Sequence, residues 1–442
     1  MAERTLINNA FIVTGNSSNT VIPKGFIMID GQEIEEIGQG KPSRNPDATI
    51  DAKGCVVIPG LITAHTHLYG ILLRGATLNI EPPTDFAQIL QRVWWPLDEA
   101  LTLDDARASA ISASADMLRN GSTFCADTYS GPNSIEGSLD KIAEGTEAVG
   151  IRSVLAFEMT ERNNPEEAER GLRENIRFIE AIKAKKPLTQ GMISIHASFT
   201  VDDAIVSKGV EAAKKLGVPI TVHTSEGLVD LYHNLERYGE RTVERLHRVG
   251  VLGKRTVLAH CVHVNGRELE LIAETGTLVA HNPMSNALNA VGTSPVPDML
   301  RRGITVGLGN DGWIYDPFEN MRAALTAHRL STGNPSAIGP LEVFRMATIE
   351  GAKCYGLDKQ IGSLERGKLA DIVILGATNI PTPLTPDSVI GHLVNSFGGR
   401  DVRHVFVNGQ HVVEGRKMVL ISDEEVSEIS RKSAAGLWSR LE

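Results

Sequence analysis

Residues 60–67 read GLITAHTH, an apolar run that ends in two histidines, His65 and His67. Such a run is typical of a strand that is buried on both faces. Residues i and i+2 of a strand point to the same side, so both imidazoles can contact one metal ion. The pair by itself is also consistent with two polar residues that hydrogen-bond to the backbone at the end of a strand.

Seven further strand-like stretches follow along the chain, and helix-like stretches separate them. The seven are STFCADTY (122–129), IRSVLAFEMT (151–160), MISIHAS (192–198), PITVHTSE (219–226), TVLAHCV (256–262), TLVAHNP (277–283) and TVGLGND (305–311). This alternation predicts an α/β protein with a closed (β/α)8 TIM-like barrel. An open doubly wound sheet is the alternative, but no G-x-G-x-x-G follows the first strand, which disfavours its dinucleotide-binding form.

Both ends of the chain look rich in strands instead. Asp30-Gly31 and Asn408-Gly409 each stand between two strand-like runs, a strong signal for a tight hairpin. We therefore predict a small β-sandwich domain assembled from residues 1–57 and 366–442. The barrel, residues 58–365, would be an insertion that folds by itself.

Polar residues stand at the carboxyl end of nearly every predicted barrel strand. They are His65, His67, Asp127, Glu158, His196, His223, His260, His281 and Asp311. Because burying an unpaired polar group costs free energy, we expect these side chains to converge on one site at the top of the barrel. Among them, three imidazoles and one carboxylate, from His65, His67, His223 and Asp311, suit a catalytic zinc or ferrous ion with an open coordination position.

Six motifs in these positions resemble the amidohydrolase superfamily, in its chlorohydrolase and deaminase branch. They are PGLITAHTH (59–67), VHTSE (222–226), LAHCV (258–262), HNPMSN (281–286), GLGNDG (307–312) and a late G-x-L-x-x-G-K-x-A-D-I-V (362–373). The segments WWPLDEAL (94–101), RNNPEEAERGLRENIRF (162–178) and TPLTPDSVIGHLV (382–394) are similar to the SsnA-type aminohydrolases. The resemblance covers almost the whole chain.

The resemblance implies a role for each matching residue. His65, His67, His223 and Asp311 match metal ligands, and Asp311 also matches the base that takes a proton from water. Glu226 matches an acid that protonates a ring nitrogen, His260 a group beside the attacking water, and His196 a substrate-facing histidine. The fourth strand ends in His196 and has no lysine to bridge two metals, so we expect one divalent ion, with zinc the first expectation and iron the alternative.

The reaction implied is attack of hydroxide, formed from water at the metal, on a heterocyclic amine, with release of ammonia. Hydrolysis of a halide, alkylamine or cyclic amide uses the same groups and is the alternative. A barrel that binds without turnover is a more distant alternative, and it predicts the loss of at least one ligand.

The long segment after the first barrel strand carries Trp94 and Trp95, which can stack on a planar ring or anchor the segment to the barrel. Further candidates for contact with a substrate follow the third and seventh strands. They are Glu158, Arg162, Asn282 and Ser285. Arg162 can bind an anionic group or pair with Glu158.

The composition limits the partners. The formal net charge of −10 disfavours nucleic acid and anionic membranes, which require a basic surface. The four cysteines form no C-x-x-C pair, and MAERTLINNAFIVTG (1–15) has no apolar signal segment, so we expect a cytoplasmic protein without a membrane span. The resemblance implies a homo-oligomer that acts on a small heterocyclic molecule.

Overall fold

Parallel strands form the centre of the molecule. The computed structural model describes residues 4–183, 185 and 188–441. Eight strands pair in chain order, each parallel to the next: β6 (Leu61–Thr66), β7 (Ser122–Tyr129), β8 (Arg152–Met159), β10 (Ile193–Ala197), β11 (Ile220–Thr224), β12 (Thr256–His260), β13 (Leu278–His281) and β14 (Val306–Leu308). All eight lie in the predicted stretches, and the short β9 (Thr189–Gly191) pairs with β8.

The first and last of these strands approach each other, so the barrel is nearly closed. Just beyond β14, the N–H of Asn310 donates to the carbonyl of His65 at 2.9 Å. Near the opposite end of β6, the N–H of Ile62 donates to the carbonyl of Ala347 at 2.8 Å. The predicted (β/α)8 barrel is confirmed, and the open doubly wound sheet is wrong.

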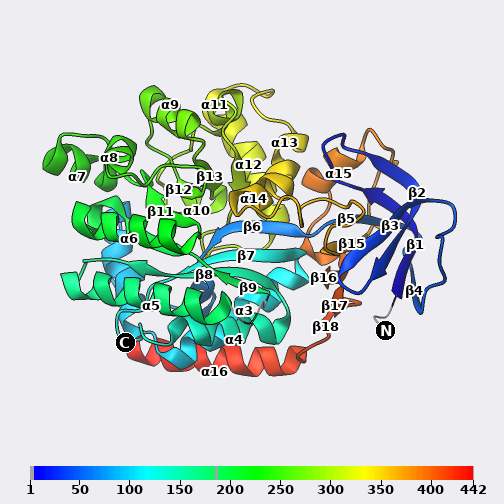
Figure 1. Cartoon of the computed structure of the whole chain (residues 1–442), viewed down its shortest axis with the longest axis horizontal. Coiled ribbons are helices and arrows are strands. Elements are labelled where there is room, and N and C mark those ends of the chain that lie inside the picture. The colour runs from blue at the N-terminus through cyan, green and yellow to red at the C-terminus, as the bar shows by residue number, and fades with distance from the viewer. Residues whose placement is uncertain (1–3, 184, 186–187, 442) are drawn as a thin grey trace.

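Helices surround the barrel (Figure 1). They are α3 (Leu103–Arg119), α4 (Ser138–Val149), α5 (Pro165–Lys183), α6 (Asp203–Leu216), α7 (Leu228–Tyr238), α8 (Thr242–Arg248), α9 (Gly266–Thr275), α10 (Pro283–Leu288), α11 (Val296–Arg301), α12 (Pro317–Thr332), α13 (Pro340–Met346) and α14 (Ile349–Cys354). Local sequence explains their limits. The Thr102 hydroxyl accepts from the N–H of Asp105, whose carboxylate accepts back from the N–H of Thr102, and this capping box begins α3. At the other end, α6 stops at Gly217, whose φ of +71° favours glycine.

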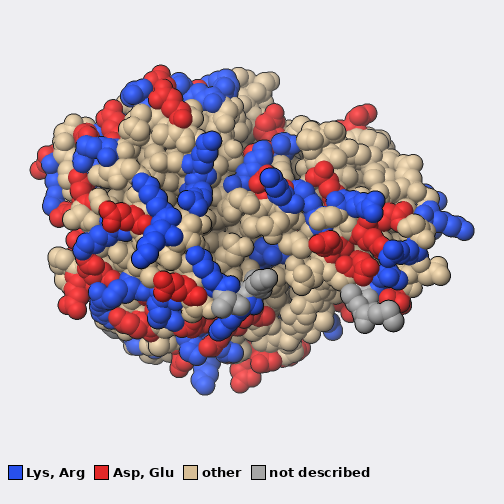
Figure 2. Space-filling view, viewed as in Figure 1, with Lys and Arg blue, Asp and Glu red and all other residues tan. Residues whose placement is uncertain are grey.

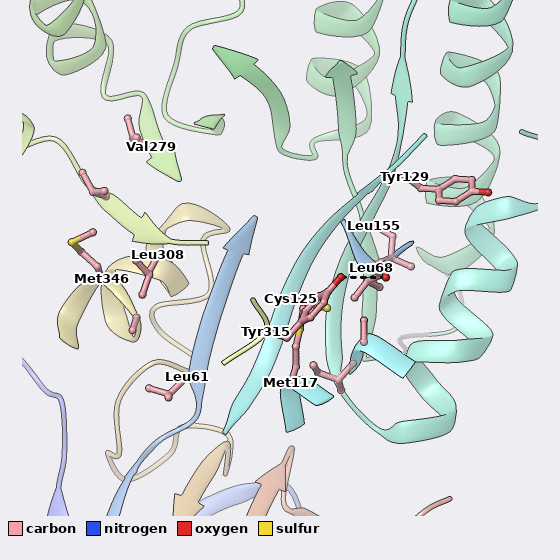
Figure 3. Packing of buried hydrophobic residues seen from close by; sticks show 14 of the residues in the cluster. Leu61, Leu68, Met117, Cys125, Tyr129, Leu155, Val279, Leu308, Tyr315 and Met346 are labelled. Carbon is pink, nitrogen blue, oxygen red and sulfur yellow. Dashed lines mark hydrogen bonds between the residues drawn. The ribbon is translucent and has the colours of Figure 1, made fainter. Parts of the chain in front are cut away.

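The segment between β6 and α3 covers one side of the barrel mouth. It contains the 3-10 helix η1 (Leu68–Leu73), α1 (Phe86–Ile89), the π-helix η2 (Leu90–Trp94) and α2 (Trp95–Ala100). Buried Tyr315 holds its start, because its hydroxyl donates to the carbonyl of His67 at 2.8 Å. The same hydroxyl lies 3.4 Å from the carbonyl of Leu68, and Figure 3 shows this second contact. The packed core seen around Leu68 therefore fixes the chain directly after the first histidine pair.

Strands from both ends of the chain form one second sheet of nine strands. They are β1 (Arg4–Val13), β2 (Val21–Asp30), β3 (Glu33–Gln39), β4 (Ala48–Asp51), β5 (Cys55–Pro59), β15 (Ile372–Gly376), β16 (Val402–Val407), β17 (Gln410–Glu414) and β18 (Lys417–Met418). Antiparallel pairing of β5 with β15 joins the two ends, and hairpins turn at Gly31 and Gly409 as predicted. The boundaries 1–57, 58–365 and 366–442 stay a prediction, and residues 1–3 and 442 lie outside the described residues.

Four elements remain. The 3-10 helix η3 (Ser198–Thr200) follows β10 in the barrel, whereas α15 (Val389–Asn395) and the 3-10 helix η4 (Gly399–Asp401) precede β16, and α16 (Asp423–Leu441) follows β18. Figure 1 shows α16 running back from this sheet along the barrel. Its Leu437 is fully buried, and the indole N–H of Trp438 donates to the carbonyl of Leu72 in η1 at 2.7 Å. Among the described residues, we find no helix with the length and apolar character needed to cross a membrane.

Candidate metal centre and active site

Three strand ends bring the four predicted metal ligands together. Nε2 of His65 lies 3.0 Å from Oδ1 of Asp311, and Nε2 of His67 lies 3.2 Å from the same oxygen. Nε2 of His67 also lies 3.2 Å from Nε2 of His223. These side chains are all at most 9% exposed as whole residues. The sequence therefore brings three imidazoles and one carboxylate to a single buried point at the top of the barrel.

The second nitrogen of two of these rings is already bonded to a carbonyl. Nδ1 of His67 lies 2.8 Å from the carbonyl of Thr128, and Nδ1 of His223 lies 2.6 Å from the carbonyl of His196. Because a carbonyl only accepts, each Nδ1 carries a hydrogen, and each Nε2 points toward the centre, where it offers a lone pair once it is unprotonated. This is the tautomer that a metal ligand requires.

The charges at this point favour a cation. Burial by itself lowers the pKa of His67, but Asp311 and Glu158 raise that pKa to about 10. Burial raises the pKa of Asp311, yet His260, His65 and His67 outweigh it and hold that pKa well below its usual range. A divalent cation suits the same place, since it replaces the proton on His67 and meets three nitrogen ligands and one oxygen ligand. The residues present therefore fit a divalent metal ion.

His260 and Glu226 stand beside the four ligands. Nε2 of His260 lies 3.5 Å from Oδ1 of Asp311 and 3.5 Å from Oε2 of Glu226. Nδ1 of His260 lies 2.8 Å from Oδ1 of Asn286, which holds the ring. His260 also joins His65, His223 and Asp311 in a group whose donor atoms lie within 4.8 Å of one another.

Burial and neighbours raise the pKa values of both members of this pair. Burial raises the pKa of Glu226 to about 7, although His260 acts in the other direction. Burial lowers the pKa of His260, but Glu226 and Asp311 raise it to about 9. A carboxyl group with a pKa near 7 can both hold and release a proton under ordinary conditions, which suits general acid catalysis.

A pocket with apolar walls lies over the centre. Phe86, Leu90 and Trp94 from the covering segment contribute to it, together with Phe199. The Trp94 ring centroid is 6.2 Å from that of His67. The cavity volume is about 50 Å³, below the roughly 300–1,000 Å³ of small-molecule sites.

Four of the seven residues that we predicted to contact a substrate line this pocket: Trp94, Trp95, Glu158 and His196. The other three lie one layer behind it. Arg162 pairs with Asp98 at 2.8 Å, and Ser285 donates from Oγ to Oδ2 of Asp311 at 2.5 Å. Nδ2 of Asn282 lies 3.3 Å from Nε2 of His260. Contact of all seven with a substrate stays a prediction.

Sequence reasoning missed four pocket residues that carry a polar group. They are Tyr69, Asp98, Asp230 and Asn289. None stands at the end of a strand, so the pattern that revealed the metal cluster did not apply. Asp230 carries the clearest local signal, because it is an acid on the buried side of α7, where its Oδ2 accepts from the N–H of Ser225 at 2.5 Å.

The amidohydrolase family model matches residues 56–412, which is most of the chain. A 5'-deoxyadenosine deaminase from Methanosarcina mazei is 36% identical over 443 residues, covering 99% of each chain. A 5-methylthioadenosine/S-adenosylhomocysteine deaminase from Syntrophobacter fumaroxidans is 33% identical over 432 residues, covering 96% of each.

Solved structures share the fold over nearly the whole chain. An adenosine deaminase from Xanthomonas campestris with bound zinc has a TM-score of 0.88 at 23% identity, covering 98% of both chains. An atrazine chlorohydrolase from Arthrobacter aurescens with zinc has a TM-score of 0.85 at 24% identity, covering 97% of this chain and 100% of the other. Together with the whole-length sequence matches, the barrel whose strand ends gather His65, His67, His223 and Asp311 makes this chain a member of the amidohydrolase family of metal-dependent hydrolases.

Proposed function

We propose that this enzyme is a zinc-dependent aminohydrolase that removes the exocyclic amino group of adenine from a small nucleoside and releases ammonia. The observation that carries the proposal is the cluster of three imidazoles and Asp311 with Glu226, an acid of pKa about 7, directly beside it. The names of the relatives at 33–36% identity, all nucleoside deaminases, support the choice of substrate class.

His65, His67, His223 and Asp311 would hold one zinc ion. When bound, such an ion supplies a water whose pKa falls from about 15.7 to about 7, and so a nucleophile at neutral pH. Zinc in the related solved structures supports the identity of the metal. One ion is favoured over two, because β10 ends at His196 and Ala197 and offers no lysine for a bridge.

The side chains of the protein then divide the proton transfers among them. Asp311 takes a proton from the attacking water, and the hydrogen bond from Ser285 holds the Asp311 carboxylate in one orientation. Glu226 gives its proton to the ring nitrogen next to the carbon under attack. His260 donates a hydrogen bond to the oxygen that becomes bonded to that carbon. The C–N bond breaks, and the nitrogen leaves as ammonia with the proton that Asp311 took from water. The oxygen on the ring carbon returns its remaining proton to Glu226, and a ring carbonyl remains.

The pocket walls would orient the purine. Trp94 lies over the metal centre, 6.2 Å from His67 between ring centroids, and can stack on a flat ring. His196 lines the pocket, while its Nδ1 is bonded to Oγ1 of Thr200 at 2.8 Å, so its other nitrogen is available to a substrate. Trp95 is instead held by Arg162, whose guanidinium lies 5.3 Å above its ring.

The test combines elemental analysis with an ammonia screen. Purified protein is expected to contain about one zinc per chain and to release ammonia from 5'-deoxyadenosine, 5'-methylthioadenosine or adenosine, with the ultraviolet shift from adenine to hypoxanthine. Chloride release from a chlorinated triazine, without ammonia from any purine, would favour the chlorohydrolase alternative. No turnover of any of these substrates by metal-loaded protein would reject the proposal.

We also propose that the enzyme works in the cytoplasm as a homo-oligomer. Only the resemblance and the composition support this. Light scattering at micromolar concentration should give a mass that is a multiple of 47.7 kDa, and a monomer would contradict it.

A further inference from the structure

Asp230 is a buried acid of the pocket that the proposed function leaves without a role. Figure 2 shows acids and bases intermixed on the visible surface of the molecule, where water surrounds them. Asp230 instead lies in α7 and is 2% exposed. Because an acid buried in this way needs hydrogen-bond donors, its partners indicate what it does.

Donors from the protein occupy both oxygens of Asp230. Oδ2 accepts from the backbone N–H of Ser225 at 2.5 Å. Oδ1 accepts from the hydroxyl of Ser198 and from Nδ2 of Asn234, the latter at 3.2 Å. The carboxylate thus links the ends of two barrel strands, since Ser198 directly follows β10 and Ser225 directly follows β11. Its bonds hold protein groups rather than a substrate.

The backbone of Ser225 needs this support. Ser225 has a φ of +49°, in the left-handed region that disfavours any side chain larger than that of glycine. Its carbonyl accepts from the N–H of Val262 at 3.1 Å and from that of His263 at 2.9 Å. With Asp230 on the N–H, both polar backbone groups of Ser225 are bonded to other segments. These bonds fix the conformation of the residue directly before Glu226.

The position of Glu226 depends on its backbone, because its side-chain contacts are long. Oε1 lies 3.4 Å from Nδ2 of Asn289, and Oε2 lies 3.5 Å from Nε2 of His260. Both distances exceed the roughly 2.7–3.2 Å of an ordinary N–H···O hydrogen bond. On the other side of Glu226, Gly227 leaves room for a ring, since a Cβ there would lie 2.5 Å from Cδ1 of Phe86. The chain on either side of Glu226 therefore sets where its carboxyl group lies.

From these contacts we infer that Asp230 is a positioning residue for the proton donor Glu226, an inference that rests on the proposed function. Asp230 holds the N–H of Ser225, and through this backbone it keeps the Glu226 carboxyl group within reach of the ring nitrogen of the substrate. Proton transfer requires a donor within about 2.6–3.2 Å of its acceptor. A displacement of the donor by about 1 Å can cost roughly 100-fold in rate.

The experiment removes this hydrogen bond with Asp230→Ala. Ammonia release is measured on the best substrate among 5'-deoxyadenosine, 5'-methylthioadenosine and adenosine, at equal metal content. We expect kcat to fall by roughly 10- to 100-fold, while KM stays within about threefold of the wild type. Asp230→Asn keeps an oxygen that can accept from the N–H of Ser225, so its kcat should stay within about threefold of the wild type.

A double-mutant comparison distinguishes positioning from general damage. If Asp230 acts through Glu226, Asp230→Ala should change kcat by less than about twofold in the Glu226→Gln background, which has no proton to position. A merely structural role would lower kcat by the same factor in both backgrounds.

The matched control is Asp401→Ala. Asp401 is 5% exposed, and its Oδ2 accepts from the backbone N–H of Gly398 at 3.0 Å. It therefore makes the same kind of bond as Asp230, but it directly precedes β16 of the second sheet. This control should leave kcat within about twofold of the wild type at equal metal content.

Amide hydrogen exchange tests the bond between Asp230 and Ser225 without turnover. Mass spectrometry of peptides that cover residues 224–228 should show exchange faster by about tenfold or more in Asp230→Ala, and little change in Asp230→Asn. If Asp230→Ala does not fold, Ser198→Ala decides, since it removes the hydroxyl that donates to Oδ1 of Asp230. Ser198→Ala should lower kcat by about threefold or more, again only when Glu226 is present.

The outcomes are distinct. The inference is overturned, and the deaminase stays intact, if Asp230→Ala leaves exchange at residues 224–228 unchanged. It is equally overturned if kcat stays at the wild-type value, or falls by the same factor with and without Glu226. If the metal-loaded wild type releases no ammonia from any of the three nucleosides, the proposed function fails and the inference fails with it. The exchange rates then still show whether Asp230 holds Ser225.

Discussion

Replacing Glu226 with glutamine removes one titratable proton and leaves the size of the side chain almost unchanged. Oε1 of Glu226 lies 3.4 Å from Nδ2 of Asn289, and the amide oxygen of glutamine can accept the same hydrogen bond. Glu226 does not belong to either group of side chains that could hold a metal among the described residues. We therefore expect Glu226→Gln to fold and to bind as much metal as the wild type.

The expected loss is in turnover. A positioned general acid contributes roughly 10²- to 10⁴-fold to the rate, so kcat should fall by that factor, or roughly 3–5 kcal/mol in the activation free energy. Burial raises the pKa of Glu226 to about 7, and only the protonated form can donate. Wild-type kcat should consequently decline as the pH rises above about 7, and the residual activity of Glu226→Gln should lack this decline.

Steady-state ammonia release between pH 5 and 9, with metal content measured on the same samples, provides the assay. Glu226→Asp is the matched variant, because it keeps an acid but shortens the side chain by one methylene, and it should retain part of the activity and the decline at high pH. Equal kcat in Glu226→Gln and wild type, at equal metal content, would refute the assignment of the proton donor.

Three further predictions concern the metal, pH and a buried cation. Removing the metal with a chelator should abolish ammonia release and lower the thermal unfolding midpoint, because a ligand that binds only the folded state stabilises that state. Added zinc should restore both. An unchanged midpoint would contradict a metal site buried in the folded protein. Burial raises the pKa of Asp127 to about 7, so the metal-free folded protein keeps a proton there that the unfolded chain loses near pH 4. The free energy of unfolding should therefore fall as the pH rises from about 4 to 7. In urea unfolding, Asp127→Asn should remove part of this fall, and identical pH profiles of the variant and the wild type would contradict the prediction. Arg245 is 1% exposed and donates to the carbonyls of Ser198 at 2.6 Å and Val201 at 2.8 Å. Arg245→Ala should therefore lower the free energy of unfolding by about 3–5 kcal/mol, as measured by denaturant unfolding. A loss below about 1 kcal/mol would refute the structural role of Arg245.

The strand ends explain why so much of the site could be predicted from the sequence. A parallel barrel strand is apolar throughout, so a histidine or acid at its carboxyl end is conspicuous, and parallel order brings all such ends to one face. His65, His223 and Asp311 could therefore be expected to meet before any distance was known. The same argument identified Glu158, although its position 3.9 Å from Nδ1 of His67 and 3.7 Å from Nδ1 of His223 depends on packing that the strand pattern does not indicate.

Residues outside the strands carry no comparable signal. Asp98 lies in a short helix of the covering segment, and its pairing with Arg162 joins positions 64 apart in the chain. Ser285 looked like a substrate contact because it follows a strand, yet its hydroxyl donates to Asp311. The docking of α16 on the barrel likewise depends on a distant surface, since Trp438 bonds to Leu72 across 366 positions. Long-range packing of this kind is not encoded in local periodicity.

The backbone gives an independent argument for the residues at the strand ends. His260 has a φ of +71° and Asp311 a φ of +56°, in the left-handed region where a side chain other than that of glycine costs about 1–2 kcal/mol. Glycine at either position would relieve that strain, as it does at the adjacent Gly312 with a φ of +78°. A chain selected for stability alone has no reason to keep an imidazole and a carboxylate there. Nε2 of His260 and Oδ1 of Asp311 lie 3.5 Å apart. The strained backbone is explained if the reaction needs both side chains at these positions, because the stability of the packed barrel offsets the local loss of free energy.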